Sequence, residues 1–262
     1  MKKFFLSLLV FVVFSLLSNA QENFAVIKDK DGYSNVREGN LNSKIVGKIE
    51  QYQPFFHEIY GFNRFEEYIK AEYTNMTFVL YYEFIKKDGY DFLQNDLEKV
   101  GEGYIHNSRI QKVEKLPSLK TKLLTNSILV LFNDSIVVTF DTGQFDKKQH
   151  TYTYGEHGEN GKYSDVDLVD GKKAWGTFYN YPRNEIKSIK ISYNNSTFEL
   201  PKNSFEDIYE PNIENDFTKV HIGKDGELYI TMHNSDGAAT YDVIWVIVDK
   251  KVKYRLTLPS DY

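Results

Sequence analysis

Cysteine is absent from the whole chain of 262 residues. The protein therefore has no disulfide bonds, and it cannot carry the lipid-modified cysteine of a bacterial lipoprotein. Its stability has to come from the burial of apolar side chains. A mature chain of about 240 residues is long enough for two domains, each with a core of its own.

Long apolar runs are scarce. Lys2 and Lys3 precede an apolar run over residues 4–17, which is too short to span a bilayer comfortably, and Ser18-Asn19-Ala20 follows it. These are the regions of a secretory signal peptide, so we expect residues 1–20 to be removed and the mature protein to be periplasmic or extracellular. The alternative is an uncleaved membrane anchor. No transmembrane segment is expected after the signal, because the best later run, residues 243–248, has only the length of a strand.

Positive charge is in the minority. The chain has 32 Lys and Arg against 37 Asp and Glu, and it shows no basic stripe. This balance argues against nucleic acid or anionic lipid as the main partner. Phosphate-binding glycine loops and a Gly-x-Ser-x-Gly elbow are also missing, so no cofactor is expected, and kinase, nucleotide-binding and α/β-hydrolase activities lack support.

Aromatic residues, by contrast, are plentiful at 16% of the chain, and they lie in short apolar runs that end in turns of Gly, Asn or Asp. Residues 136–140 before Asp141-Thr142-Gly143 are one example. This pattern predicts an all-β protein. Small helical contributions are expected over residues 205–209, which Pro211 would end, and over residues 93–100.

The strand pattern is interrupted between Gln111 and Lys122 by a polar stretch that contains Pro117. We place a domain boundary there, with an N-terminal domain over residues 21–115 and a C-terminal domain over 116–262. A single domain over the whole mature chain is the alternative.

Several segments of the N-terminal half carry a family resemblance. Residues 25–27, then residues 31–39 with Asn35-Val36-Arg37, then residues 45–49, resemble the opening of a bacterial SH3 (SH3b-like) domain, and residues 103–110 are similar to its last strand and turn. The resemblance implies a small barrel with a long insertion at about residues 50–102. Val36 would point into the core, Arg37 would pin a neighbouring loop, and Gly47 and Gly103 would give room for close packing.

Domains of this family commonly bind cell-wall peptidoglycan or short peptides, so the resemblance implies a recognition module for peptidoglycan or an envelope protein or peptide. The aromatic insertion can form or cover the binding groove. The candidates for ligand contact are the aromatic residues Tyr33, Tyr60, Phe62, Tyr81 and Tyr104.

The C-terminal half reads as a run of strands, for which we expect a β-sandwich-like domain. Residues 172–176, 186–191 and 230–246 are similar to a C-terminal domain that recurs in exported bacterial proteins of unassigned activity. Trp175 and Trp245 lie inside strand-like runs and are expected to anchor the core.

An enzymatic alternative rests on residues 141–167, where His157 stands between Glu156 and Glu159 and where Asp141, Asp146, Asp165 and Asp167 also concentrate. Paired carboxylates can divide acid and base roles in the hydrolysis of an envelope polymer. Zinc-ligand spacing is missing, and although His221 and His233 fall on neighbouring predicted strands, we predict no metal site.

The leading prediction is a binding protein without catalytic activity. The hydrolase, or a factor assisting one, and a structural or inhibitory partner of another exported protein remain alternatives, and the sequence does not decide the oligomeric state.

Overall fold

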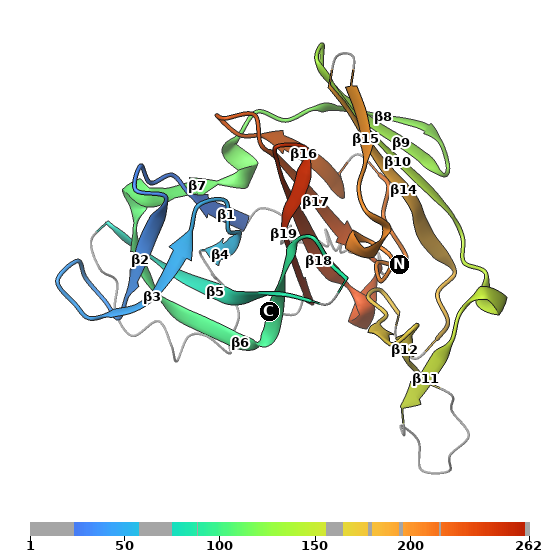
Figure 1. The fold of residues 1–262 in the computed structure, drawn as a ribbon, viewed down its shortest axis with the longest axis horizontal. Helices are drawn as coiled ribbons and strands as arrows, with labels where there is room; N and C mark the ends of the chain where they lie inside the picture. Colours follow the sequence, from blue (N-terminus) through green and yellow to red (C-terminus); the bar gives the residue numbers. More distant parts are fainter. Residues whose placement is uncertain are drawn as a thin grey trace, which may run out of the picture.

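The computed structural model describes residues 24–57, 75–87, 89–155, 165–177, 180–193, 196–214 and 216–259. The all-β prediction is confirmed: strands make up 61% of the structure, and within the described residues no helix reaches seven residues. Nor does any helix of this part of the chain have the length and apolar character needed to cross a membrane. The strands form a curled half-barrel sheet and further sheets (Figure 1).

The largest sheet has 11 strands. Its main path, in hydrogen-bonded order, is β16 (Thr218–Ile222), β17 (Leu228–Asn234), β18 (Tyr241–Val248), β19 (Lys251–Pro259), β6 (Leu93–His106), β5 (Met76–Lys86), β4 (Phe55–His57), β1 (Phe24–Ile27) and β7 (Ile110–Lys112). Off this path, β2 (Tyr33–Arg37) pairs with β6 and with β3 (Ile45–Glu50). Strands β19 and β6 are parallel, and they join the two halves of the chain.

The remaining strands form smaller sheets. The 5-stranded sheet has the order β15 (Ser196–Glu199), β14 (Asn184–Tyr193), β10 (Ile136–Gln144), β9 (Ile128–Phe132) and β8 (Lys120–Thr125). The 3-stranded sheet consists of β11 (Tyr152–Gly155), β12 (Asp165–Val169) and β13 (Lys172–Lys173). Short 3-10 helices connect strands: η2 (Asn107–Arg109), η3 (Val113–Lys115), η4 (Lys147–Gln149), η5 (Lys202–Ser204) and η6 (Gly237–Ala239).

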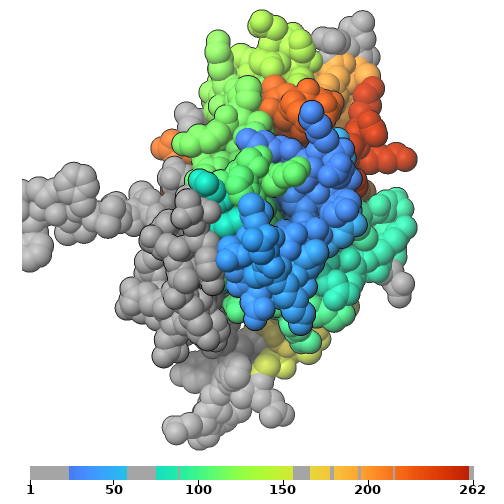
Figure 2. All heavy atoms as spheres, turned by 90° about the vertical axis from the view of Figure 1, so that its left-hand side faces the viewer, coloured from blue at the N-terminus to red at the C-terminus, as the bar shows by residue number. Residues whose placement is uncertain are grey.

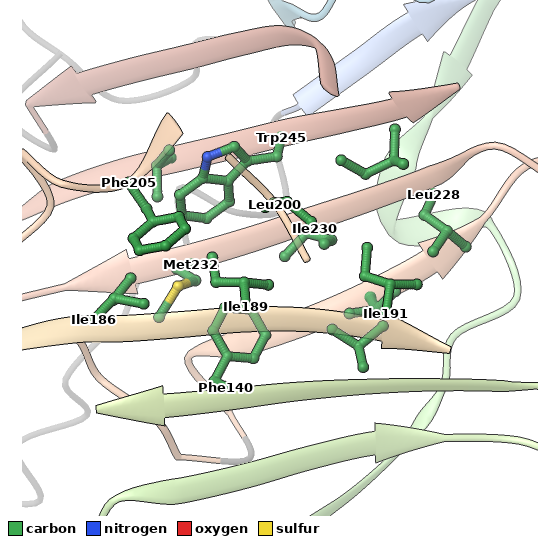
Figure 3. Close-up of a cluster of buried hydrophobic side chains, with 14 of the residues drawn as sticks. Phe140, Ile186, Ile189, Ile191, Leu200, Phe205, Leu228, Ile230, Met232 and Trp245 are labelled. Atoms are coloured by element: carbon green, nitrogen blue, oxygen red, sulfur yellow. The ribbon is translucent and has the colours of Figure 1, made fainter. Parts of the chain in front are cut away.

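Strands β16 to β19 lie between two other layers (Figure 1). On one face, Ile230, Met232 and Trp245 pack against Phe140 and Ile189 of the 5-stranded sheet (Figure 3). On the other face, alternate residues of the same strands pack against the N-terminal half of the curled sheet. Because both faces are covered, residues 243–248 of β18 form one continuous apolar run instead of alternating with polar residues. Trp175 and Trp245 are buried, as expected.

The boundary predicted at residues 115/116 does not separate two cores. One hydrophobic cluster contains Phe24, Phe78 and Tyr104 from the N-terminal half together with Ile244 and Leu256 from the C-terminal half. Both halves also contribute strands to the largest sheet. The strands on the two sides of residue 115 therefore bury each other's apolar faces, and the division into two domains stays a prediction.

The N-terminal half has a smaller cluster of its own, around Ala25, Val36, Ile49, Phe55 and Val79. Several local expectations hold here. Val36 is fully buried, and the Arg37 guanidinium donates to the carbonyl of Ser43 at 2.8 Å, which pins the loop between β2 and β3.

The glycine expectations for this half are also confirmed. A Cβ on Gly103 would lie 2.7 Å from the Arg37 carbonyl oxygen, and a Cβ on Gly47 would lie 1.8 Å from the Tyr81 hydroxyl. At Gly103 the close atom belongs to the backbone, so only glycine fits, and at Gly47 a larger residue would displace the Tyr81 side chain.

The expected helix over residues 93–100 is wrong. Leu93 and Gln94 pair with β19, and the Asn95 side chain continues that pairing by donating to and accepting from the backbone of Thr257 at 3.1 and 3.0 Å. Tertiary pairing overrides the local propensity. The expected turn over residues 205–209 contains no α-helix; it follows the 3-10 helix η5, whose residues Lys202–Ser204 precede it.

A candidate binding groove

A groove of about 570 Å³ opens where β6 leaves β19 and joins β2. At one end, Leu93 of β6 pairs with Tyr254 of β19, and at the other, Tyr104 of β6 pairs with Arg37 of β2. Strands β2 and β19 thus share one edge of β6 at different places, and the groove lies in the fork between them. The β2–β3 hairpin, in blue, stands at the front of this side of the molecule (Figure 2).

A wide bulge in β6 shapes one wall. Tyr82 of β5 pairs with Val100, but Phe84 pairs with Asn95, so Glu83 alone stands opposite residues 96–99. The extra residues bend the strand and carry polar groups to the rim. There Lys99 Nζ lies 3.2 Å from Glu83 Oε1 and 3.8 Å from Asp96 Oδ2. Because Lys99 and Glu83 are exposed, their ion pair contributes little stability, and their charges stay accessible.

The floor of the groove is aromatic and apolar. The rings of Phe84 and Tyr254 meet edge to face with centroids 5.1 Å apart, and Leu93 lies beside them. Lys253 Nζ lies 5.5 Å from the centroid of the Tyr254 ring. The lining therefore combines an apolar base with charged edges, an arrangement that suits a ligand with apolar faces and polar ends.

Tyr81 forms the other end of the groove. Its ring lies over two glycines: a Cβ on Gly101 would come within 2.2 Å of the ring, and a Cβ on Gly47 would come within 1.8 Å of the hydroxyl. The hydroxyl donates to the carbonyl of Val46 at 3.2 Å. Burial raises the pKa of the Tyr81 phenol, so the group stays neutral and keeps its proton for this bond. Tyr81 thereby ties β5 to the β2–β3 hairpin.

The aromatic residues proposed from the sequence fall in different places. Tyr81 lines the groove. Tyr33 is exposed on β2 beneath Lys48 Nζ, which lies 4.0 Å from its ring centroid and itself lines the groove, so Tyr33 borders the rim. Tyr104 is 7% exposed and packs edge to face on Phe78, within the shared core. Tyr60 and Phe62 lie outside the described residues.

The sequence reading did not nominate Phe84 or Tyr254. Phe84 stands in the same aromatic stretch as Tyr81, so its residue type was a usable signal. Tyr254 enters the groove only through the parallel pairing of β19 with β6, a contact between distant parts of the chain that leaves no local signature.

Strand β3 borders the groove with a side that has no strand partner among the described residues. Ile45 and Val46 on this strand are 48% and 43% exposed. An unpaired strand edge presents N–H and C=O groups to an incoming extended chain.

The carboxylates of the enzymatic alternative are not brought together where the structure describes them. Asp141 lies on β10 of the 5-stranded sheet, Asp167 is exposed on β12 of another sheet, and Asp165 begins that same strand. Asp146 caps η4, and the hydrogen bond from the Lys148 N–H lowers the pKa of its carboxyl group. His157, Glu156 and Glu159 lie outside the described residues.

Histidines do form close pairs with carboxylates, which the sequence reading missed. His150 Nδ1 lies 2.6 Å from Asp170 Oδ2, and His233 Nδ1 lies 2.8 Å from Asp242 Oδ1. His221 and His233 do not face each other, because His221 stands opposite Tyr229 and His233 opposite Asp242. In the part of the chain that the structure describes, no cluster of three or more His, Asp or Glu residues could hold a metal ion.

Comparison with known proteins adds no relative: no family model, no curated protein and no solved structure matches this chain, and the bacterial SH3 resemblance stays a prediction.

Proposed function

We propose that this protein is an exported binding protein without catalytic activity, and that its groove takes an extended segment of cell-envelope material, either peptidoglycan or a peptide. The observation that carries the proposal is the position of the aromatic floor, with Phe84 and Tyr254, beside the unpaired side of β3. The signal-like N-terminus and the resemblance to bacterial SH3 domains support the envelope as its place of action.

The parts of the groove have complementary uses. The edge of β3 can supply backbone hydrogen bonds to an extended chain, and the floor can supply apolar contact. Lys48, Glu50, Glu83 and Lys99 at the rim carry both signs of charge, so polar groups of either sign find a partner. Such a site favours a ligand with a repeated backbone and alternating apolar and polar groups.

The direct test is sedimentation of the full mature chain with isolated peptidoglycan. Phe84→Ala should weaken binding about tenfold or more, as expected for the loss of a central aromatic anchor. Phe198→Ala is the matched control, because Phe198 is also half-buried and in ring contact with a tyrosine, Tyr193, but lies on β15 of the 5-stranded sheet. It should leave binding unchanged.

Competition separates the possible ligands. If soluble muropeptides displace the protein from peptidoglycan and peptides from digested envelope proteins do not, the ligand is the wall. The reverse result identifies a peptide. No binding to either material at any salt concentration, or an equal loss for both alanine variants, would overturn the proposal.

A further inference from the structure

A second hollow of about 490 Å³ lies on the other side of β5 and β6 from the groove. Successive residues of these strands face opposite sides of the sheet. Phe84 and Leu93 line the groove, whereas their neighbours Ile85 and Gln94 line this second cleft. Its opposite wall comes from the C-terminal half, with Lys172, Lys173 and Trp175. Both halves of the chain therefore build it.

The floor of this cleft holds a buried amide. Gln94 is 5% exposed and stands between Ile85 of β5 and Arg255 of β19. Its side chain forms no hydrogen bond with any described residue. Arg255 beside it is saturated, since it donates to both Asp207 oxygens at 2.7 and 2.6 Å and to the carbonyl of Ser204 at 3.1 Å. Gln94 is not among the residues whose polar atoms are fully buried without a partner, so its amide opens into the cleft, where a bound molecule can hydrogen-bond to it.

Three lysines line the same cleft. Lys172 is paired with Glu206, but Lys87 and Lys173 form no ion pair with the described residues. Lys173 Nζ lies 3.8 Å from the Trp175 ring centroid. Burial and the nearby Arg255 guanidinium lower the pKa of Lys87, and burial lowers that of Lys173, as expected for ammonium groups that lack a counter-ion.

The acidic groups of the cleft form no ion pair with Lys87 or Lys173, although the charges of Asp207 and Asp96 favour the charged form of Lys87. Asp207 is held by Arg255, and Asp96 lies 3.8 Å from Lys99. Glu98 is exposed at the mouth, and Asp167 acts on Lys173 only as a weaker favourable charge. The cleft is therefore lined by two exposed ammonium groups that form no ion pair with the described residues and by the Gln94 amide.

We infer that this cleft binds an organic carboxylate, with its oxygens between Lys87, Lys173 and the Gln94 amide and its carbon skeleton against Ile85 and Leu97. A carboxylate fits better than a phosphate, because the one guanidinium of the cleft, Arg255, is already committed to Asp207, and arginine forks are the usual phosphate ligands. This site is separate from the groove of the proposed function, and it goes beyond that function.

The test is calorimetric titration of the full mature chain with N-acetylleucine, with N-acetylleucinamide and with inorganic phosphate. The acid should bind and the amide should not. Lys87→Met and Lys173→Met should each weaken binding of the acid about tenfold, the scale of one lost charge-assisted contact. Lys86→Met is the matched control, because Lys86 is exposed and adjacent in the chain but does not line the cleft.

A further variant guards against simple misfolding. Gln94→Leu should abolish binding of the acid without lowering the melting temperature of the ligand-free protein, since the amide has no hydrogen-bond partner among the described residues that would be lost. Equal binding of acid and amide, binding of phosphate alone, or no binding would overturn the inference. Sedimentation with peptidoglycan should be unaffected by Lys173→Met, so failure here leaves the groove proposal standing.

Discussion

At the residue scale, Arg255 is the one charged residue among the largest fully buried side chains of the described residues. It is fully buried and forms a bidentate ion pair with Asp207, and its neighbour Trp245 donates to the carbonyl of Ser204 at 2.7 Å. Together they fasten the segment around residues 204–207 onto β18 and β19. The segment has little secondary structure of its own, so these contacts decide its position.

Arg255→Met should lower the free energy of unfolding by about 3–5 kcal/mol, because it leaves Asp207 buried without its cation. Urea denaturation followed by circular dichroism measures this change. Arg183→Met is the control: Arg183 pairs with Glu210 but its side chain is 78% exposed, so the loss should stay below about 1 kcal/mol. Equal losses for both variants would contradict this account.

The pKa shifts of His233 and His221 predict opposite dependences of protein stability on pH. The hydrogen bond to Asp242 raises the pKa of His233, so its stabilising contribution is complete below the unfolded pKa near 6.5 and is lost as pH rises through the folded value. Burial lowers the pKa of His221, so the protein loses stability as pH falls below about 6.5 toward the folded value.

Melting temperatures at several pH values check these signs. His233→Gln should destabilise the protein more at pH 5 than at pH 8, and His221→Gln should make the protein less sensitive to acid. A destabilisation by His233→Gln that does not change with pH would show that the Asp242 pair does not titrate as described.

At the element scale, the position of the β2–β3 hairpin depends on the space above two glycines. Gly101→Ala would place a Cβ within 2.2 Å of the Tyr81 ring, so Tyr81 has to move and its bond to Val46 breaks. We expect a loss of about 1–3 kcal/mol, as for other overpacked sites, and weaker peptidoglycan binding.

A double-mutant cycle tests this contact. In the Tyr81→Ala background the ring is gone, so Gly101→Ala should cost at least about 1 kcal/mol less than in the wild-type chain. Additive effects would show that the glycine is needed for a reason other than the tyrosine.

At the scale of the whole molecule, the shared core predicts cooperative folding. Residues 21–115 expressed alone would expose Phe24, Phe78 and Tyr104, which in the full chain pack against Ile244 and Leu256. They would also lose the pairing of β6 with β19. The fragment should therefore lack dispersed amide resonances and should bind a hydrophobic dye, and the full chain should unfold in one transition. A well-dispersed spectrum of the fragment would contradict the shared core.

The amino-acid sequence by itself determined the all-β class, some of the tight turns and several local roles. The turn expected at Asp141-Thr142-Gly143 is wrong, because these residues continue β10 and pair with β14. Asp170-Gly171 and Asp225-Gly226 form hairpin turns, with positive φ at Asp170, Gly171 and Gly226, as their residue types indicated. Arg37 pins its loop and Val36 is buried, because these contacts lie within a few residues or follow the two-residue period of a strand.

Tertiary structure alone decided which surfaces meet. Residues 93–100 carry a local pattern that suits a helix. Leu93 is nevertheless a strand residue, because it pairs with β5 on one side and with β19 on the other. The same long-range pairing brings Tyr254 to the groove and turns Gln94 toward the second cleft. Contacts between segments far apart in the chain are chosen by the burial of whole faces, and no short window of residues records that choice.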